Sequence, residues 1–190
     1  MPPKQIKNLK YYASGKRGII CTFSKNNILY ALKTKNPSSI AEERIKNEAR
    51  YLKILNKYDI GPKLISSGKD YVIYEFINGK LLKDAKFKSI HIKQILQQCY
   101  QIDKLKLNKM EMHHPLKHII INRNKAYLID FERCYKTNHP KNITQFCQYL
   151  MERNLIPKKE TKLILKNYKK TYSKKEFEKL LSLVSYSQRH

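Results

Sequence analysis

The sequence contains little glycine, few acidic residues and no long apolar run. Five glycines among 190 residues leave little room for flexible low-complexity segments, and 41% hydrophobic residues predict a folded chain. This length suits one domain or two small lobes. No apolar run approaches the roughly 20 residues that span a bilayer, and the opening MPPKQIKNLK lacks an apolar signal core. We therefore expect a cytoplasmic protein with no membrane partner.

Cysteines and acids are also scarce. Cys21, Cys99, Cys134 and Cys147 lack CxxC spacing, which argues against a zinc site or a disulfide framework and favours buried free thiols. Only 15 acids oppose 40 Lys and Arg, so the formal net charge is +25. Such an excess is typical of proteins with a polyanionic partner, such as RNA or a ribonucleoprotein. A lysine-rich compositional bias is the alternative interpretation, and both stay open.

Two glycines and two cations occupy a predicted strand connection near the N-terminus. Gly15, Lys16, Arg17 and Gly18 lie between Tyr11-Tyr12 and the apolar run 19–23. Glycine lets backbone N–H groups approach a phosphate closely, and the two cations add charge. The segment is a candidate phosphate-binding turn, with a ligand-free β-turn as the alternative. It is not a Walker loop, because the GxxxxGK[ST] spacing is absent.

The next predicted strand runs from Ile28 to Lys33. Period-two alternation puts Lys33 on one face with Leu29 and Ala31. A strand-end lysine usually extends to water, but one that stays inside requires an anion.

A predicted helix supplies that anion. Residues 39–42 form a capping box, and Gly61-Pro62 is a stop signal. Glu48 lies between them on an apolar stripe with Ala41, Ile45, Leu52 and Leu55. We expect Glu48 to pair with Lys33, since each ion offsets the desolvation of the other. A glutamate at the border of the stripe is the alternative.

A second hairpin is predicted over 63–76, and the extended connection that follows suggests a seam between residues 1–78 and 79–190. Beyond it, a helical stripe begins at Ser89, and further helices begin near Asn142, after Pro157 and at Ser173. Between the first two of these helices the runs 118–121 and 126–129 predict a hairpin. Asp130 follows that hairpin directly. We expect His91, His139 and His190 at the surface.

From about Tyr12 to Leu150 this order of parts resembles the protein-kinase-like fold in a minimal form. The resemblance implies an α+β, two-lobed architecture with a small antiparallel N-lobe containing one helix and a reduced, mainly helical C-lobe. The sequence is similar to RIO kinases and to the small kinase of the archaeal KEOPS complex. It is most similar to predicted archaeal Ser/Thr kinases, in its RG-type loop and its PLKH and IDFER segments.

The resemblance implies roles for individual residues. In that family a Gly-rich loop and a strand lysine bind the phosphates, a helix glutamate positions the lysine, a hinge binds adenine, and an acid after a strand holds magnesium. The matching positions are Gly15 to Gly18, Lys33, Glu48, Glu75 to Ile77, and Asp130. The implied cofactors are ATP and Mg2+.

The catalytic loop departs from the family pattern. Counting back twelve residues from Asp130 places His118 where a metal-binding asparagine is expected and His113 where the catalytic aspartate is expected. A loop longer by two residues makes Glu111 the base instead, which preserves a carboxylate there. Glu132 replaces a glycine and is a candidate second metal ligand.

Three hypotheses follow. The first is an ATP- and Mg2+-dependent phosphotransferase, specifically an atypical Ser/Thr protein kinase. Since no Ala-Pro-Glu motif follows Arg133, its acceptor is expected to be the chain itself, one dedicated partner or a small molecule. The second is a catalytically silent kinase-like module that binds RNA or a ribonucleoprotein through the basic C-terminal helices. The third is a small-molecule kinase of the aminoglycoside-phosphotransferase type.

Overall fold

The computed structural model describes residue 6 and residues 8–15, 18–36 and 43–186. The chain divides into two compact units, the first made of residues 1–78 and 129–134 and the second of residues 79–128 and 135–190. The short segment 129–134 thus belongs to the first unit, although residues of the second unit precede and follow it in the sequence. No helix within the described ranges is long and apolar enough to cross a membrane.

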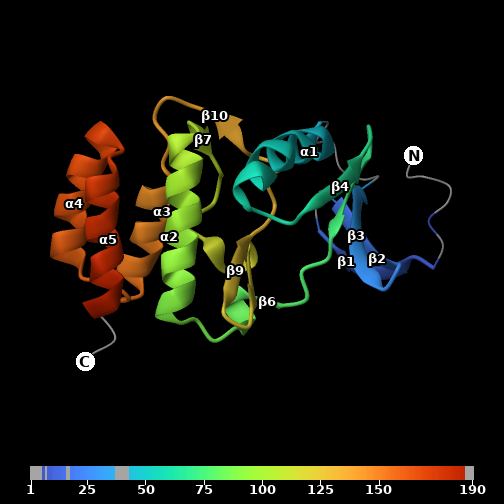
Figure 1. The fold of residues 1–190 in the computed structure, drawn as a ribbon, viewed down its shortest axis with the longest axis horizontal. Helices are drawn as coiled ribbons and strands as arrows, with labels where there is room; N and C mark the ends of the chain where they lie inside the picture. Colours follow the sequence, from blue (N-terminus) through green and yellow to red (C-terminus); the bar gives the residue numbers. More distant parts are fainter. Residues whose placement is uncertain (1–5, 7, 16–17, 37–42, 187–190) are drawn as a thin grey trace. The chain divides into compact units, whose positions relative to one another are not determined.

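The first unit is built on a five-stranded antiparallel sheet (Figure 1). Its strands are β1 (Lys10–Ser14), β2 (Gly18–Lys25), β3 (Ile28–Lys35), β4 (Leu64–Ser67) and β5 (Tyr71–Glu75), in the order β1-β2-β3-β5-β4. β3 is therefore a central strand that pairs with β2 on one side and β5 on the other.

Burial along β3 differs from the predicted alternation. Ala31, Leu32 and Lys33 are all buried, whereas Ile28 and Leu29 are exposed. The β2–β3 turn at residues 26–27 has two asparagines with positive φ, as a two-residue hairpin turn requires. Ile28 and Leu29 follow this turn directly and lie at the tip of the hairpin, while both faces of the strand are covered further along.

Helix α1 (Arg44–Leu55) packs against β3, β4 and β5. The predicted stripe is buried at Ile45, Glu48, Leu52 and Leu55. The predicted capping box at 39–42 lies outside the described residues. The helix begins after Glu43, which has φ of 63° and makes no side-chain capping bond.

The end of this helix is closed by a short connection to β4. After η1 (Asn56–Tyr58), the side-chain amide of Asn56 donates to the carbonyls of Ile60 and Pro62, and its oxygen accepts from Leu64 N–H. Gly61 has φ of +83°, and a Cβ there would lie 2.8 Å from the Leu52 side chain. A side chain is thus excluded by both backbone conformation and space.

The second unit combines helices with two small antiparallel sheets (Figure 1). One sheet has the order β6-β8-β9 and the other pairs β10 with β7. The strands are β6 (Lys80–Leu81), β7 (Leu107–Asn108), β8 (Ile119–Asn122), β9 (Lys125–Leu128) and β10 (Tyr135–Lys136). The predicted hairpin over 118–129 is confirmed by the β8–β9 pairing.

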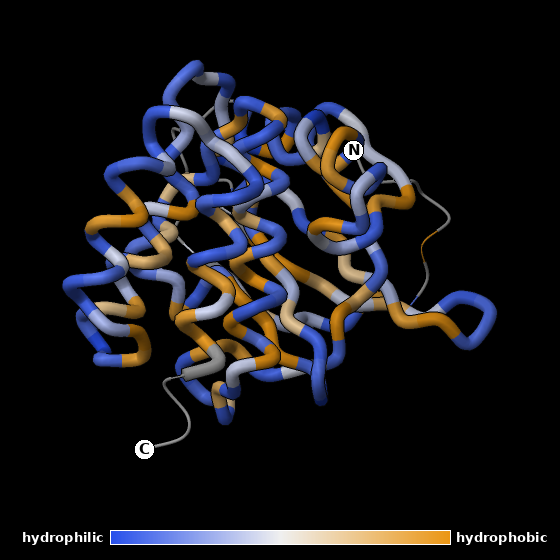
Figure 2. Tube along the Cα trace, turned by 60° about the vertical axis from the view of Figure 1, so that its left-hand side comes forward, coloured by the Kyte–Doolittle hydropathy of each residue, from blue (hydrophilic) through white to orange (hydrophobic). Residues whose placement is uncertain are grey.

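The helices of this unit are α2 (Ser89–Lys104), α3 (Asn142–Glu152), α4 (Lys158–Thr171) and α5 (Lys174–Tyr186), with single turns η2 (Leu82–Asp84) and η3 (Pro115–Lys117). α2 packs against β9, α3 and α5, and α4 packs against α3 and α5. Apolar and polar residues alternate within the turns of the helical parts of the tube (Figure 2), as in amphipathic helices. The predicted α2 stripe of Ile92, Ile95, Leu96, Cys99 and Ile102 is buried.

Two expectations about single residues need correction. His91 is buried, at 1% exposure, whereas a surface position was predicted. Its Nδ1 accepts from Lys88 N–H at 3.1 Å, so Nε2 carries the proton and donates to the Arg123 carbonyl at 2.9 Å. The imidazole is buried because both ring nitrogens have backbone partners. Among the cysteines, all four thiols are free but Cys21 is only half-buried.

A buried carboxylate joins three helices of the second unit. One oxygen of Asp103, in α2, accepts from the backbone N–H and side-chain amide of Asn142. The other accepts from Ile143 N–H at 3.3 Å and from the Tyr168 hydroxyl at 2.9 Å. Burial raises the pKa of Asp103 to about 6, although these hydrogen bonds act in the opposite direction. Tyr172 and the buried thiols Cys99 and Cys147 are the other titratable groups near it.

Asp103 should make stability depend on pH. Its folded pKa of about 6 lies above its ordinary value of 3.8, so the folded state holds the proton more tightly. The contribution of protonated Asp103 to the free energy of unfolding is therefore greatest below pH 4. It is lost as the pH rises through 6, a change of about 3 kcal/mol. Urea unfolding measures the unfolding free energies of the parent and of Asp103→Asn. The difference between the two proteins should change by about 3 kcal/mol between pH 4 and pH 7. A difference that is flat across this range contradicts the prediction.

Candidate active site

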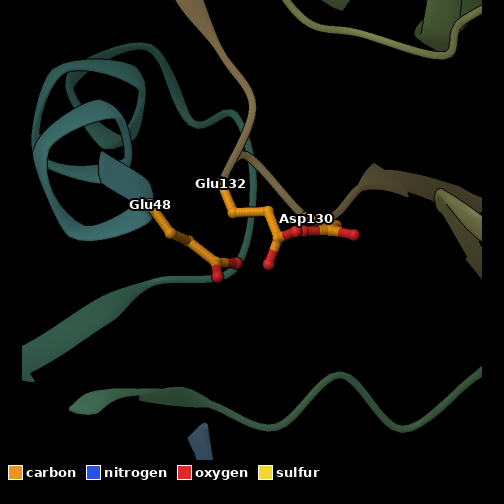
Figure 3. Close-up of side chains that lie close together, drawn as sticks. All are labelled: Glu48, Asp130 and Glu132. Atoms are coloured by element: carbon orange, nitrogen blue, oxygen red, sulfur yellow. The ribbon is translucent and has the colours of Figure 1, made fainter. Parts of the chain in front are cut away.

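Four charged side chains meet inside the first unit. Lys33 Nζ lies 2.6 Å from Glu48 Oε2, 3.2 Å from Asp130 Oδ1 and 3.3 Å from Glu132 Oε2. The side chains of Lys33, Glu48 and Glu132 are 9%, 2% and 5% exposed, whereas that of Asp130 is 34% exposed. The three carboxylates converge from α1 and from segment 129–134 (Figure 3). The structure thus brings together residues 33, 48, 130 and 132, which the sequence singled out separately.

Three separate parts of the chain position this cluster. Lys33 projects from central strand β3, and Glu48 from the buried stripe of α1. Asp130 comes two residues after β9 ends and has φ of 64°, a left-handed conformation that Asp tolerates better than most residues. The next residue, Phe131, is fully buried, and a Cβ at Gly61 would lie 2.9 Å from its ring. Anchoring of Phe131 fixes the acids on either side of it.

Asn47 ties α1 to the same segment, a role that the sequence analysis missed. Its side-chain amide donates to the backbone carbonyls of Glu132 at 2.8 Å and Cys134 at 2.9 Å. Asn47 precedes Glu48 directly. One turn of α1 therefore binds both the backbone of segment 129–134, through Asn47, and the ammonium of Lys33, through Glu48. In the sequence, this role is indicated only by the position of Asn47, a hydrogen-bonding residue, directly before Glu48.

The electrostatics of the cluster keep the lysine charged. Burial alone would lower the pKa of Lys33, but the carboxylates, Glu48 foremost, outweigh it and hold that pKa well above its ordinary value. Burial raises the pKa of Glu48, with Lys33 opposing this shift. The described contacts thus bring one ammonium within 3.3 Å of three carboxylates.

The acids have the chemistry of a magnesium site. One oxygen each from Glu48, Asp130 and Glu132 lie within 4.8 Å of one another. Carboxylate oxygens are the protein ligands that Mg2+ prefers, and one or two are usual because the ion retains water. Asp130 is the most exposed of the three, and Glu48 is the acid closest to the lysine. Asp130 and Glu132 therefore suit a hard divalent cation better than Glu48 does.

The predicted phosphate loop is described at its two glycines only; Lys16 and Arg17 lie outside the described residues. Gly15 N–H donates to the Gly18 carbonyl at 2.9 Å, which closes a tight turn between β1 and β2. A Cβ at Gly18 would lie 3.0 Å from the Thr34 carbonyl oxygen and 3.3 Å from Lys33 Cε. Because glycine has no side chain, the backbone at Gly18 can lie close to the aliphatic part of Lys33.

The predicted hinge, Glu75 to Ile77, leaves the end of β5. Glu75 N–H donates to the Lys63 carbonyl, and Phe76 N–H donates to the Leu29 carbonyl, each at 2.9 Å. The Glu75 side chain pairs with Lys63 Nζ at 3.0 Å. The backbone N–H groups of Glu75 and Phe76 are thus both bonded to carbonyls of the first unit. Ile77, the third residue of the predicted hinge, comes directly after these two bonds.

The predicted catalytic-loop residues lie in the second unit. Glu111 has φ of 73°, and its Oε2 lies 3.0 Å from His118 Nε2. The ring of His113 contacts that of His114, with centroids 4.3 Å apart. Glu111 and His113 are both half-buried, so both are candidates for a base in contact with solvent or substrate. The contact with His118 holds the Glu111 carboxylate in place.

Comparison with known proteins shows the fold. No protein-family model matches the chain, and no curated protein sequence matches it. A crystal structure of Rio2 kinase from Chaetomium thermophilum is similar with a TM-score of 0.62 at 11% identity; the match covers 78% of this chain and 56% of that one. The chain thus spans little more than half the length of that kinase.

A second Rio2 kinase structure from the same organism, a complex with ADP, Mg2+ and phosphoaspartate, is similar with a TM-score of 0.65 at 14% identity. That match covers 97% of this chain and 72% of the other. The chain therefore has a two-lobed protein-kinase-like fold of the α+β class, as the sequence predicted.

Removing the cation of the cluster should destabilise the protein. Lys33→Met leaves three neighbouring carboxylates without their ammonium, and we expect a loss of about 3–5 kcal/mol in unfolding free energy at pH 7. The loss should shrink toward pH 4, because protonated acids no longer repel one another. Glu48→Gln should cost less, since Lys33 keeps two acids. Urea unfolding checks both variants, with Lys46→Met on the exposed side of α1 as the control; equal effects at positions 33 and 46 would contradict the prediction.

Losing the Asn47 amide should loosen segment 129–134. Asn47→Ala removes donors from two carbonyls, which costs about 1–3 kcal/mol. Asn47→Asp should cost more, because a carboxylate would face the same two carbonyl oxygens. Urea unfolding measures the free energies, and hydrogen exchange should show faster amide exchange at residues 131–134. Alanine and aspartate variants as stable as the parent would remove the proposed tether.

Proposed function

We propose that the protein is an ATP- and Mg2+-dependent phosphotransferase, specifically an atypical Ser/Thr protein kinase that acts in the cytoplasm. The observation that carries the proposal is the contact of Lys33 with Glu48, Asp130 and Glu132. A lysine paired with a helix acid, beside an acid that follows a strand, is the arrangement with which kinases bind nucleotide phosphates and their metal. The kinase-like fold supports the same interpretation, and the IDFER and PLKH segments resemble those of predicted archaeal kinases.

Each nucleotide-binding role has a physical basis. Lys33 would contact the phosphates while Glu48, its nearest partner, fixes the direction of the ammonium. Gly18 lies beside the stem of Lys33, so we propose that the predicted loop, with the charges of Lys16 and Arg17, also contacts phosphate. Adenine would bind the backbone at Ile77, since the N–H groups of residues 75 and 76 are already bonded.

The oxygen donors of the cluster support a metal requirement. The three carboxylates offer oxygens within 4.8 Å of one another, which a divalent cation would bind beside the nucleotide phosphates. Asp130 and Glu132 are the residues proposed to hold Mg2+, which would neutralise charge on the phosphates. One of the similar Rio2 kinase structures is a complex with ADP, Mg2+ and phosphoaspartate, and this supports a nucleotide and Mg2+ as the proposed cofactors here.

For the base we favour Glu111 over His113. The Glu111 carboxylate has a fixed partner in His118, and a carboxylate suits the electrostatics of phosphoryl transfer to a hydroxyl. We propose a serine or threonine of the chain itself or of one dedicated protein as the acceptor. Only β10 and a few residues separate Cys134 from α3, so there is little chain to form a general peptide platform.

Variants of the cluster test nucleotide binding and transfer. Lys33→Ala should weaken Mg-ATP binding at least tenfold in calorimetry and abolish transfer from labelled ATP. Asp130→Asn keeps a side chain that tolerates positive φ but removes the charge, so transfer should fall at least a hundredfold while the fold persists. Lys46→Ala is the matched control. If Lys33→Ala and Asp130→Asn bind and transfer like the parent, the proposal fails.

The two candidates for the base give opposite results. Glu111→Gln should lower kcat by about 10²–10⁴ with little change in ATP affinity, since general-base catalysis contributes a factor of this size. His113→Asn should stay within a few fold of the parent. A large loss in His113→Asn together with a mild one in Glu111→Gln would assign the base to His113.

A further inference from the structure

A groove in the second unit is lined by α3 and α4 and shares no residue with the proposed nucleotide site. Its volume is about 1160 Å³, and it is lined by α3, the residues that precede α3, α4 and Tyr172. Pockets for small ligands usually hold about 300–1,000 Å³ and are mostly apolar. This groove is larger, and lysine is the residue most frequent in its walls. It suits an extended, charged ligand better than a small molecule.

The lysines form one row. Lys158, Lys162 and Lys166 lie at four-residue intervals on α4, Lys169 and Lys170 continue the row, and Lys141 lies on the opposite wall. Residues four apart share a helix face and are separated by about 6 Å along the axis, so the row extends about 18 Å. Its spacing is comparable with that of phosphates along an extended polynucleotide strand.

No acid balances this row. In the part of the chain that the structure describes, none of the six lysines lies within 4 Å of a carboxylate, and Glu152 is the one acid in the groove walls. Glu152 accepts a hydrogen bond from Gln148 instead. Like charges four apart destabilise a helix, so the spacing of Lys158, Lys162 and Lys166 has no benefit for helix stability. Only Lys169 and Lys170, in the last turn, favour the helix dipole.

Neighbouring α5 shows that lysine abundance alone does not produce this pattern. On α5, Lys174 pairs with Glu178 and Lys179 with Glu176, which is the usual solvated arrangement of a charged helix. On α4, five of the six lysines line the groove, and the one acid of the helix, Glu160, does not; within the described residues none of these five lysines has an ion-pair partner. The contrast argues for a ligand of opposite charge at α4 rather than for compositional bias.

An aromatic ring lies among the groove residues after the end of the row. Tyr172 follows α4 with φ of 49°, its ring packs edge-on against Tyr168 at 5.4 Å, and its hydroxyl donates to the Pro140 carbonyl at 3.2 Å. The ring is thus held in place and half-buried. A positive groove with a fixed aromatic is the combination that binds single-stranded nucleic acid, with cations on the backbone and a base stacked on the ring.

We propose that the α3–α4 groove binds a single-stranded polynucleotide. The row on α4 and Lys141 contact successive phosphates, and Tyr172 stacks on one base. The site is separate from the proposed phosphotransfer residues and binds without ATP.

Fluorescence anisotropy with labelled single-stranded RNA, the matching DNA and duplex RNA tests this in the absence of nucleotide. The groove variant is Lys158→Gln, Lys162→Gln and Lys166→Gln combined. The control is Lys53→Gln, Lys57→Gln and Lys69→Gln combined, three exposed lysines of the first unit that change the net charge equally. Because each neutralised phosphate contributes about 0.7 to the salt slope, the groove variant should lose about 2 from the slope and at least tenfold in affinity. The control should bind like the parent.

Several results would overturn the proposal. Equal losses in the two triple variants would show diffuse attraction to the whole basic surface. Tighter binding of duplex RNA, or displacement of RNA by polyglutamate at equal charge, would show a site without single-strand character. Tyr172→Asn, which tolerates the positive φ, should weaken binding about tenfold whereas Tyr172→Phe should not; equal binding by both would remove the stacking contact. Circular dichroism confirms that each variant is folded.

Discussion

The first unit depends on one constraint, the burial of an ammonium group. A lysine as enclosed as Lys33 stays charged only if anions replace its water, and here three carboxylates do so. They come from a helix and from a segment almost a hundred residues distant in the sequence, so satisfying one charge holds three parts of the chain together. Asn47 adds hydrogen bonds to the same segment, which shows that its position is fixed by more than charge.

The same constraint gives the site its chemistry. The exposed fraction of Asp130 is far larger than that of Glu48 or Glu132, so the cluster is open to solvent chiefly at one acid. A ligand that binds at this acid would contact carboxylate oxygens and lie near the fixed ammonium of Lys33. Under the proposed function, the carboxylates would hold the metal and the ammonium the phosphates of a nucleotide.

Sequence patterns predicted those residues of the site that belong to a strand or helix with a regular apolar pattern. Lys33 and Glu48 were found because each lies on an apolar face, and Asp130 because an apolar strand ends before it. The contact of Glu132 with Lys33 was not predicted, since sequence spacing alone does not show which way its side chain turns. Asn47 and His91 were missed for another reason: their partners are backbone carbonyls far along the chain, and backbone carbonyls carry no sequence signal. Ile28 and Leu29 are exposed because they lie at the tip of the hairpin. The alternation of apolar and polar residues does not predict where a hairpin ends.

The distribution of the few acids also explains where the positive charge is free. Glu48, Asp130 and Glu132 surround one lysine, Asp103 is buried among hydrogen-bond donors, and two glutamates of α5 pair with lysines of their own helix. With 15 acids in the whole chain, these commitments leave few for the remaining lysines. The uncompensated charge then concentrates where a helix presents a row of lysines to a groove, as α4 does. A net charge of +25 is thus not spread evenly: four acids lie in the Lys33 cluster and the core, whereas α4 has six lysines and one acid, Glu160.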